Sequence, residues 1–370
     1  MVNKEFLNFR FLLAAFFLLL AAMIFIGIYP FNFFPPNRVL WLPNKPGLYF
    51  DHDGIAYTDR RESISIKKAI SVELLLKERP DSKNWGPREI FSFYDGAHSP
   101  SFLVGQWSGR IFIYSRFEKN EGGEWYRLFR TKHRFPRGKD HLVTITFDKS
   151  EKAIYLDGQL SDRKNVELID KTHIEFSGSF LLGNSYSGNN GWMGEIQGLA
   201  IYNRILQPDE IVTHKRKIFQ KGMSGLVETP GCLALYPFDE GKGNTAKSIS
   251  DKPRPFTIPV SIHALPRTIL SLPYNDMRSQ EVDKADFIEN IFFFVPFGIL
   301  LTAIILKKQR NSYFSTFLIV ILAGALLSIV IEASQLFLPT RNSGMADIIS
   351  NILGNGFGML ATFTLLKQKL

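Results

Sequence analysis

Cysteine is almost absent from this chain. Cys232 stands alone among 370 residues, so no disulfide can form within the chain. Nucleic-acid-binding motifs are absent as well, although the net charge is +9. The lysines and arginines are spread along the whole chain, which is typical of a solvated surface rather than a nucleic-acid-binding patch. We therefore expect domains that are stabilised by their cores, and a protein without a nucleic-acid partner.

Long hydrophobic runs are absent from the middle of the chain, between about residues 39 and 284, and present on both sides of it. Four predominantly apolar windows lie there, at residues 11–28, about 287–306, 313–335 and 347–366. Each window is about as long as a helix needs to cross a hydrocarbon core of about 30 Å. We therefore predict four transmembrane helices, with membrane lipid as a partner, and a polar domain inserted between the first and the second.

The basic residues near these windows predict the orientation in a cell membrane. They precede the first window, fill the loop between the second and third, and follow the fourth: Lys4, Arg10, Lys307, Lys308, Arg310, Lys367 and Lys369. The positive-inside rule then places both termini in the cytoplasm and the inserted domain outside it. No small-residue cleavage site precedes Tyr29, so we expect the first window to be a retained anchor rather than a signal peptide.

Short alternating runs fill the inserted segment. Candidate strands are Val72–Leu76, Ile90–Tyr94, Phe102–Gly105, Arg110–Tyr114, Phe180–Leu182 and Glu195–Tyr202. Leu142–Phe147 and Ile154–Leu156 are two further alternating runs, and Asp157-Gly158 after the second is a strong hairpin signal. Pro208, Asp209 and Glu210 indicate the start of one helix. Many short strands at this spacing favour an antiparallel β-sandwich, here the jelly-roll kind.

Two blocks in this segment resemble a known family. They are Ala153 to Gln159 with Phe180 to Asn184, and Gly194 to Arg204 leading into Leu206 to Ile211. Both resemble a concanavalin A-like lectin/glucanase domain of the laminin-G-like kind, which implies such a sandwich over residues 39–272. Leu233 to Phe238 resembles the opening strand of these domains although it follows the closing block. Two explanations are open. Either the sandwich is permuted and this strand pairs beside Ile196–Tyr202, or the segment is a remnant of a second copy of the domain.

The resemblance implies binding of sugars, glycans or proteins through loops. The best candidate glycan-binding loop contains Tyr186, Asn189, Asn190 and Trp192. The competing interpretation is that Trp192 fills the edge of the sandwich and the other residues only turn the chain. Hydrolysis in this domain is rejected, because no strand carries the pair of carboxylates that glycosidases use.

Metal ligands are scarce. The four windows contain no His or Cys, and we expect no cofactor. Calcium is the one metal that the inserted domain suggests, through Asp51, Asp53 or Asp59. Asp51-His52-Asp53-Gly54 is, however, more often a turn.

Polar residues inside the last three windows recur at helical spacing. They are Asp286 and Asn290; Ser328, Glu332 and Gln335; and Asp347, Asn351 and Asn355. Residues four apart share one face of a helix, so each helix carries one polar stripe. Gly354 and Gly358 let another backbone approach closely. A compact bundle would bring the stripes together at one membrane face.

These residues resemble the VanZ-like family of small bacterial membrane proteins. The matching elements are Asp286 and Asn290 with Phe294-Val295-Pro296-Phe297-Gly298, then Glu332 and Gln335, then Arg341 with Asp347 and Asn351. The resemblance covers residues 273–370, with residues 1–38 as the anchor. It implies a cell-envelope role, through an association with low-level glycopeptide resistance, and no agreed activity.

Two interpretations of this cluster remain open. It is either a buried network that fixes the bundle, or a polar pocket of Asp286, Asn290, Glu332, Gln335, Arg341, Asp347 and Asn351. In the pocket, Arg341 would contact phosphate or carboxylate and would pair with Glu332 or Asp347. We favour a protein that binds or senses surface glycan or a lipid-linked envelope precursor. The alternatives are a membrane enzyme acting on such a precursor and a scaffold for another envelope protein.

Overall fold

A computed structural model describes residues 9–59, 64–81, 86–97, 99–119, 129–170, 174–250, 254–266, 284–308, 312–341 and 344–367. The chain divides into two compact units. One combines Met1–Phe33 with Thr268–Leu370, and the other is Phe34–Arg267. Lys4, Arg310 and Lys369, which contributed to the predicted orientation, lie outside the described residues.

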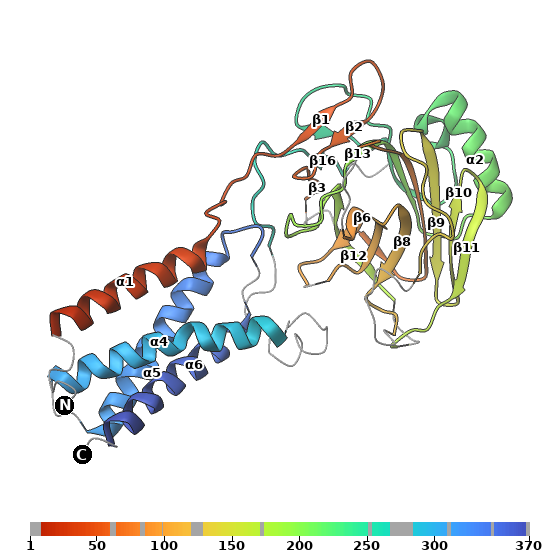
Figure 1. The fold of residues 1–370 in the computed structure, drawn as a ribbon. Coiled ribbons are helices and arrows are strands. Elements are labelled where there is room, and N and C mark those ends of the chain that lie inside the picture. Colours follow the sequence, from red (N-terminus) through yellow and green to blue (C-terminus); the bar gives the residue numbers. More distant parts are fainter. Residues whose placement is uncertain are drawn as a thin grey trace. The chain divides into compact units, whose positions relative to one another are not determined.

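The second unit is a sandwich of two antiparallel sheets (Figure 1). In the described residues the first sheet contains, in spatial order, β1 (Val39–Trp41), β2 (Leu48–Phe50), β13 (Gly194–Tyr202), β5 (Ala69–Glu78), β9 (His141–Asp148), β10 (Glu151–Leu156) and β11 (Gln159–Asn165), and β14 (Cys232–Tyr236) also pairs with β13. The second sheet contains β15 (Thr245–Ala246), β16 (Phe256–Thr257), β3 (Ala56–Thr58), β12 (Phe176–Leu182), β6 (Arg88–Tyr94), β7 (Phe102–Trp107) and β8 (Arg110–Ser115), and β4 (Ile64–Ile66) also pairs with β12.

Alternation along the strands decides what each face of a sheet covers. In β5, Val72 and Leu74 point into the core between the two sheets. Leu75 lies instead with the cluster on the outer side of the first sheet, and Glu73 between Val72 and Leu74 belongs to the same face. The central strands of the first sheet are therefore buried on both faces.

All six candidate strands lie within observed strands, and the two further alternating runs lie within β9 and β10. The Asp157-Gly158 hairpin joins β10 to β11, and both residues have positive φ angles, 50° and 82°. Such angles are what a type I′ hairpin turn requires. The prediction of an antiparallel sandwich is confirmed.

The strand that follows the closing block completes the sandwich. In β14, Ala234 is opposite Ile201 and Tyr236 is opposite Leu199 of β13. The predicted pairing is therefore confirmed. The same segment also supplies β15 and β16 to the second sheet, so it contributes to both layers.

One helix, α2 (Pro208–Lys221), covers the outer face of the first sheet. It begins as predicted with Pro208 and a capping box between Gln207 and Glu210. Arg204 donates to both oxygens of Glu210 at 2.7 Å and holds the pKa of that carboxyl at about 2. The short η3 (Met223–Leu226) follows α2.

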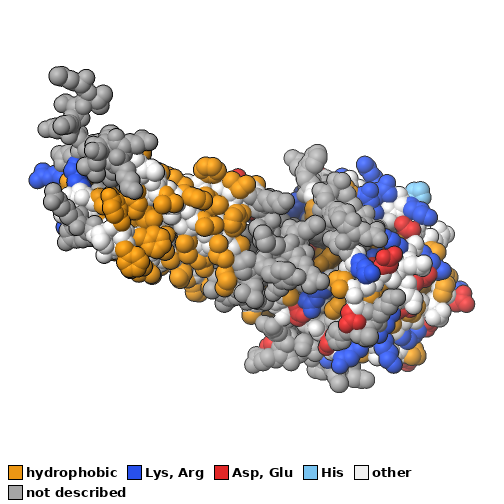
Figure 2. All heavy atoms as spheres, turned by 90° about the horizontal axis from the view of Figure 1, so that it is seen from below, with side chains coloured by type: hydrophobic (Ala, Val, Ile, Leu, Met, Phe, Trp, Pro, Cys, Tyr) orange, Lys and Arg blue, Asp and Glu red, His pale blue; other side chains and the backbone are white. Residues whose placement is uncertain are grey.

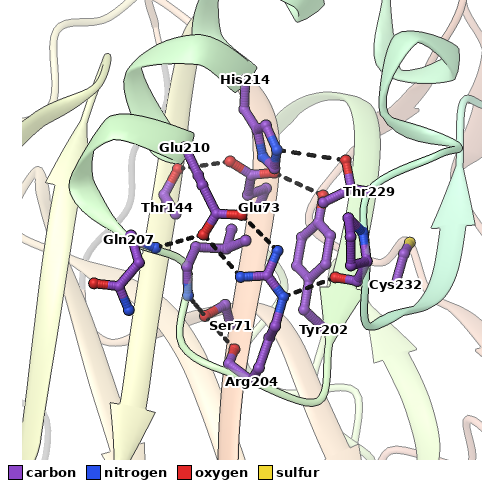
Figure 3. A network of polar contacts seen from close by, with 12 residues as sticks. Ser71, Glu73, Thr144, Tyr202, Arg204, Gln207, Glu210, His214, Thr229 and Cys232 are labelled. Carbon is purple, nitrogen blue, oxygen red and sulfur yellow. Dashed lines mark hydrogen bonds and ion pairs between the residues drawn. The ribbon is translucent and has the colours of Figure 1, made fainter.

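Below α2 lies a buried polar network centred on Glu73 (Figure 3). Its Oε2 accepts from the Tyr202 hydroxyl and from His214 Nδ1, each at 2.9 Å, and its Oε1 accepts from the Thr144 hydroxyl at 3.2 Å. Glu73 is fully buried and His214 is 4% exposed. The network joins the first sheet to α2.

The first unit contains α1 (Phe9–Ile28), α4 (Lys284–Lys308), α5 (Tyr313–Gln335) and α6 (Met345–Lys367). Among the described residues these are the four helices that are long and apolar enough to cross a membrane, as predicted. Figure 2 shows hydrophobic side chains gathered over the helical part of the face that it draws. Large exposed apolar residues such as Leu18 and Phe314 are typical of a lipid-facing surface.

Glycines bring α4 and α6 into backbone contact. A Cβ atom on Gly354 would lie 2.0 Å from the Ile291 carbonyl oxygen, and one on Gly358 would lie 2.1 Å from the Val295 carbonyl oxygen. Neither oxygen is at the end of a side chain that could move aside. The small-residue pair predicted from sequence thus sets the spacing of these two helices.

Candidate functional site

The polar side chains of α5 and α6 face each other, and they meet at successive helical turns because the two helices run antiparallel. Asn355 Nδ2 donates to the Val320 carbonyl at 2.5 Å, and Asn351 Nδ2 donates to Ser328 Oγ at 3.0 Å. One turn further on, Glu332 lies within electrostatic range of Asp347. The fourfold spacing in the sequence therefore brings these side chains together.

The third stripe, on α4, reaches the same end of the bundle through one residue. Asn290 Nδ2 donates to Asp347 Oδ1 at 2.8 Å. Asp286, four residues earlier, is exposed. Asn290 therefore contacts the cluster, whereas no hydrogen bond or ion pair joins Asp286 to it among the described residues.

Backbone carbonyl oxygens at the end of α1 accept hydrogen bonds that the sequence did not predict. Gln335 Nε2 donates to the Gly27 carbonyl at 2.9 Å, and Arg341 donates to the Tyr29 carbonyl from Nε at 3.3 Å and from Nη2 at 3.1 Å. The last carbonyls of a helix have no partner within the helix, so these side chains take that place.

The predicted ion pair of Arg341 is wrong for the described residues. No ion pair within 4 Å joins its guanidinium to Glu332 or Asp347 there, although Glu332 lies within its electrostatic range. The physical reason is the competing acceptor, since the terminal carbonyl of α1 lies within reach of the guanidinium. Arg341 therefore binds the backbone at the end of α1 rather than either carboxylate.

Two oxygens in this cluster are buried without a hydrogen-bond partner among the described residues. They are Glu332 Oε2 and Asn351 Oδ1, on side chains whose residues are 5% and 4% exposed. The backbone N–H of Gly344 lies near the Glu332 carboxylate. A buried acceptor without a donor costs free energy unless water, an ion or a ligand supplies one. We name Glu332, Asp347, Asn351 and Asn290 the polar end cluster.

The sandwich has its own candidate loop between β12 and β13. Trp192 is fully buried, and its indole N–H donates to Gln106 Oε1 at 2.7 Å. Tyr186 is half-buried and stacks on Tyr94 with ring centroids 4.6 Å apart, and Asn189 is exposed. Asn190 Nδ2 donates to Glu89 Oε1 at 3.1 Å.

Two family models match separate parts of this chain. Residues 52–212 match the family model described as the concanavalin A-like lectin/glucanases superfamily, and residues 232–366 match that of VanZ/LLP1. One part of this chain thus resembles concanavalin A-like domains, and another part resembles VanZ proteins. The VanZ match begins at Cys232, the first residue of β14, so it includes strands of the sandwich. The search of curated proteins found no match.

Solved structures resemble the concanavalin A-like domain only distantly. A carbohydrate-binding protein from Bacteroides ovatus is 10% identical with a TM-score of 0.41, and the match covers 62% of each chain. A Trypanosoma rangeli sialidase is 14% identical with a TM-score of 0.37, over 48% of this chain and 28% of that one. A pentraxin from Limulus polyphemus is 13% identical with a TM-score of 0.34, over 49% of this chain and 79% of that one. At these values we infer nothing about function.

The burial of Trp192 corrects part of the loop prediction. Its ring lies in the core between the sheets, so it is not a surface on which a sugar could stack. Tyr186, Asn189 and Asn190 remain the predicted glycan-binding residues of the concanavalin A-like domain.

Sequence reasoning missed Glu89, which lies beside this loop. Its backbone N–H donates to the Asn190 carbonyl at 2.8 Å, and its side chain is 6% exposed. Burial raises the pKa of this carboxyl to about 7. No sequence signal marks it, because a Glu near the start of a strand is usually solvated.

Calcium stays a prediction for this domain. Arg38 lies 3.7 Å from a carboxylate oxygen of Asp51 and 3.7 Å from one of Asp53. A calcium ion there would have to displace this guanidinium. Asp59 has interactions of its own and lies just before residues that the structure does not describe.

We expect Glu89→Gln to stabilise the concanavalin A-like domain more at pH 8 than at pH 5. The folded-state pKa of about 7 lies above the ordinary value of 4.5 for a glutamate, so ionisation opposes folding as pH rises from 4.5 through 7. The difference between the two pH values should be about 2–3 kcal/mol. Denaturant unfolding can be followed by tryptophan fluorescence, because all five tryptophans lie between residues 41 and 192.

The control for this experiment is Glu228→Gln, which changes an exposed glutamate of the same unit. It should leave the pH dependence of unfolding unchanged. Equal pH dependence in Glu89→Gln and the unchanged protein would show that Glu89 is not the group concerned.

Proposed function

We propose that this chain is a multi-pass cell-envelope protein that binds a phosphate-bearing, lipid-linked glycan precursor at the polar end of its VanZ region. The observation that carries the proposal is the convergence of the polar end cluster and Arg341 at one end of a bundle of apolar helices. Ionisable groups at a membrane span are costly, and by default they mark a site. The envelope role that the VanZ resemblance implies agrees with this choice.

The donors and acceptors suit a phosphorylated sugar. Arg341 is exposed, and its two bonds to Tyr29 use Nε and Nη2, which leaves Nη1 for a phosphate oxygen. Asn351 and Glu332 offer oxygens to hydroxyl or amide N–H groups. A lipid tail would lie along the apolar helix surfaces.

For the concanavalin A-like domain we propose glycan binding through Tyr186, Asn189 and Asn190. The family match supports a glycan-binding role, and the half-buried Tyr186 is held in place by its stacking on Tyr94. This binding is independent of the site in the VanZ region, and either can exist without the other.

Binding of polyprenyl phosphate and polyprenyl-diphosphate sugars to the purified full-length protein in detergent tests the proposal. Arg341→Gln should weaken binding more than about tenfold, because a hydrogen bond to a charged group is worth about 1.5–3 kcal/mol. Lys308→Gln, at the other end of α4, removes the same charge and should have no effect. No saturable binding to the unchanged protein would refute the proposal, whereas release of a product that Glu332→Gln abolishes would favour the enzyme alternative.

We further propose that the concanavalin A-like domain lies outside the cell and both termini inside. In a Cys232→Ser background, a cysteine at the exposed Val260 should react with a membrane-impermeant reagent in intact cells. A cysteine at Lys308 should react only after lysis. The reverse pattern would invert the orientation.

A further inference from the structure

The polar end cluster contains more oxygen acceptors than the described residues can satisfy. Glu332 Oε2 and Asn351 Oδ1 are both at least nine-tenths buried and lack a donor there. Asp347 adds a second carboxylate within electrostatic range of Glu332. These side chains come from facing turns of α5 and α6, where Asn351 donates to Ser328, four residues before Glu332.

The negative charges in the cluster also call for a further partner. Two neighbouring carboxylates at the end of apolar helices repel each other and lose hydration. Among the described residues, Arg341 is the cation within electrostatic range of Glu332, and its guanidinium donates hydrogen bonds to the Tyr29 carbonyl. The nearby Gly344 N–H carries no net charge. A positive charge or a proton is therefore needed beside Glu332.

We propose that the polar end cluster binds a divalent metal ion of the magnesium class through Glu332, Asp347 and the amide oxygen of Asn351. Hard cations prefer oxygen ligands, and magnesium typically uses one or two carboxylates while it keeps water and takes phosphate oxygens as its remaining ligands. Two carboxylates and one amide are the protein's share of such a set. Asp347 is half-buried rather than enclosed, which gives the ion a way in.

The metal ion would explain why the cluster lies beside a guanidinium without pairing with it. A phosphate bound by Arg341 could share the ion with Glu332 and Asp347, so that cation and arginine neutralise it from two sides. This last step rests on the proposed function, whereas the metal site itself rests only on the cluster.

Manganese binding tests the site without any lipid, because Mn²⁺ takes the same ligands and is detected by electron paramagnetic resonance. Purified full-length protein in detergent should bind Mn²⁺ saturably, and Mg²⁺ should compete. Mn²⁺ should also raise the melting temperature, since an ion that binds only the folded state stabilises it. Glu332→Gln keeps the shape of the side chain and should weaken binding at least about tenfold, as loss of metal-site partners does.

Asp286→Asn is the matched control, because Asp286 is an exposed carboxylate on α4 with no bond to the cluster among the described residues. It should bind Mn²⁺ as the unchanged protein does. Equal binding by Glu332→Gln and the unchanged protein would overturn the site. So would stabilisation by acid alone, which would mean that the carboxylates share a proton. Mn²⁺ binding without precursor binding would keep the metal site and reject the proposed function.

Discussion

Replacing Gly354 and Gly358 together by alanine is expected to separate α6 from α4. Each new methyl group would lie 2.0 or 2.1 Å from a carbonyl oxygen of α4, so the two backbones must move apart. Overpacking typically costs about 1–3 kcal/mol per site, so the pair should lose about 2–6 kcal/mol. The measurement is the loss of helical ellipticity on heating the purified protein in detergent, together with the yield of monodisperse protein.

Gly356→Ala is the matched control on the same helix. The nearest atom to its new methyl group would be Ile321 Cδ1 at 3.7 Å, which is an ordinary contact. Because alanine favours a helix over glycine by about 1 kcal/mol, this variant should be neutral or slightly more stable. If the double variant melts like Gly356→Ala, close packing at these glycines does not hold the bundle together.

The contrast among these glycines shows how far the sequence could predict the bundle. The spacing of Gly354 and Gly358 predicts a contact face, because residues four apart share one side of a helix. The spacing of four residues also predicts the polar contacts that Ser328, Asn351 and Asn355 form between α5 and α6. Periodicity does not reveal which of several faces meet, so it could not single out Ile291 and Val295 as the partners.

Hydrogen bonds from side chains to backbone carbonyls could not be predicted from the sequence. Arg341 was assigned a carboxylate because opposite charges attract, yet it donates to the Tyr29 carbonyl. Every residue has such a carbonyl, and only the end of α1 leaves this one without an intrahelical donor. Which carbonyls become available is a property of the fold and has no signature in residue type.

The sandwich shows the same division. Strands with alternating residues, the Asp157-Gly158 turn and the return of β14 were all predictable, because each has a local pattern. The burial of Trp192 was one of two interpretations of its loop, and its partner Gln106, which lies 86 positions away, could not be predicted. Glu89 was missed for the same reason: its burial depends on Asn190, which follows it by 101 positions. Contacts with residues far away in the sequence bury residue types that are usually exposed, and they fix the hydrogen bonds of these residues.

Glu73 illustrates this most strongly, and Glu73→Ala should destabilise the concanavalin A-like domain by about 2–6 kcal/mol. The substitution leaves the Tyr202 hydroxyl and His214 Nδ1 without their shared acceptor in a fully buried place. Each unsatisfied buried group costs about 1–3 kcal/mol. Glu73→Gln should cost less, because its amide oxygen still accepts one of the two bonds.

Denaturant unfolding followed by tryptophan fluorescence measures the loss, and Glu151→Ala is the control. Glu151 lies on β10 of the same sheet and forms an ion pair with Arg163 at 3.3 Å, but both side chains are more than 40% exposed. An exposed pair is worth about 0–1 kcal/mol, so this variant should remain close to the unchanged protein. If Glu73→Ala and Glu151→Ala lose the same stability, the network under α2 does not fasten the helix to the sheet, and the apolar contacts around Ile211 and Ile218 do so alone.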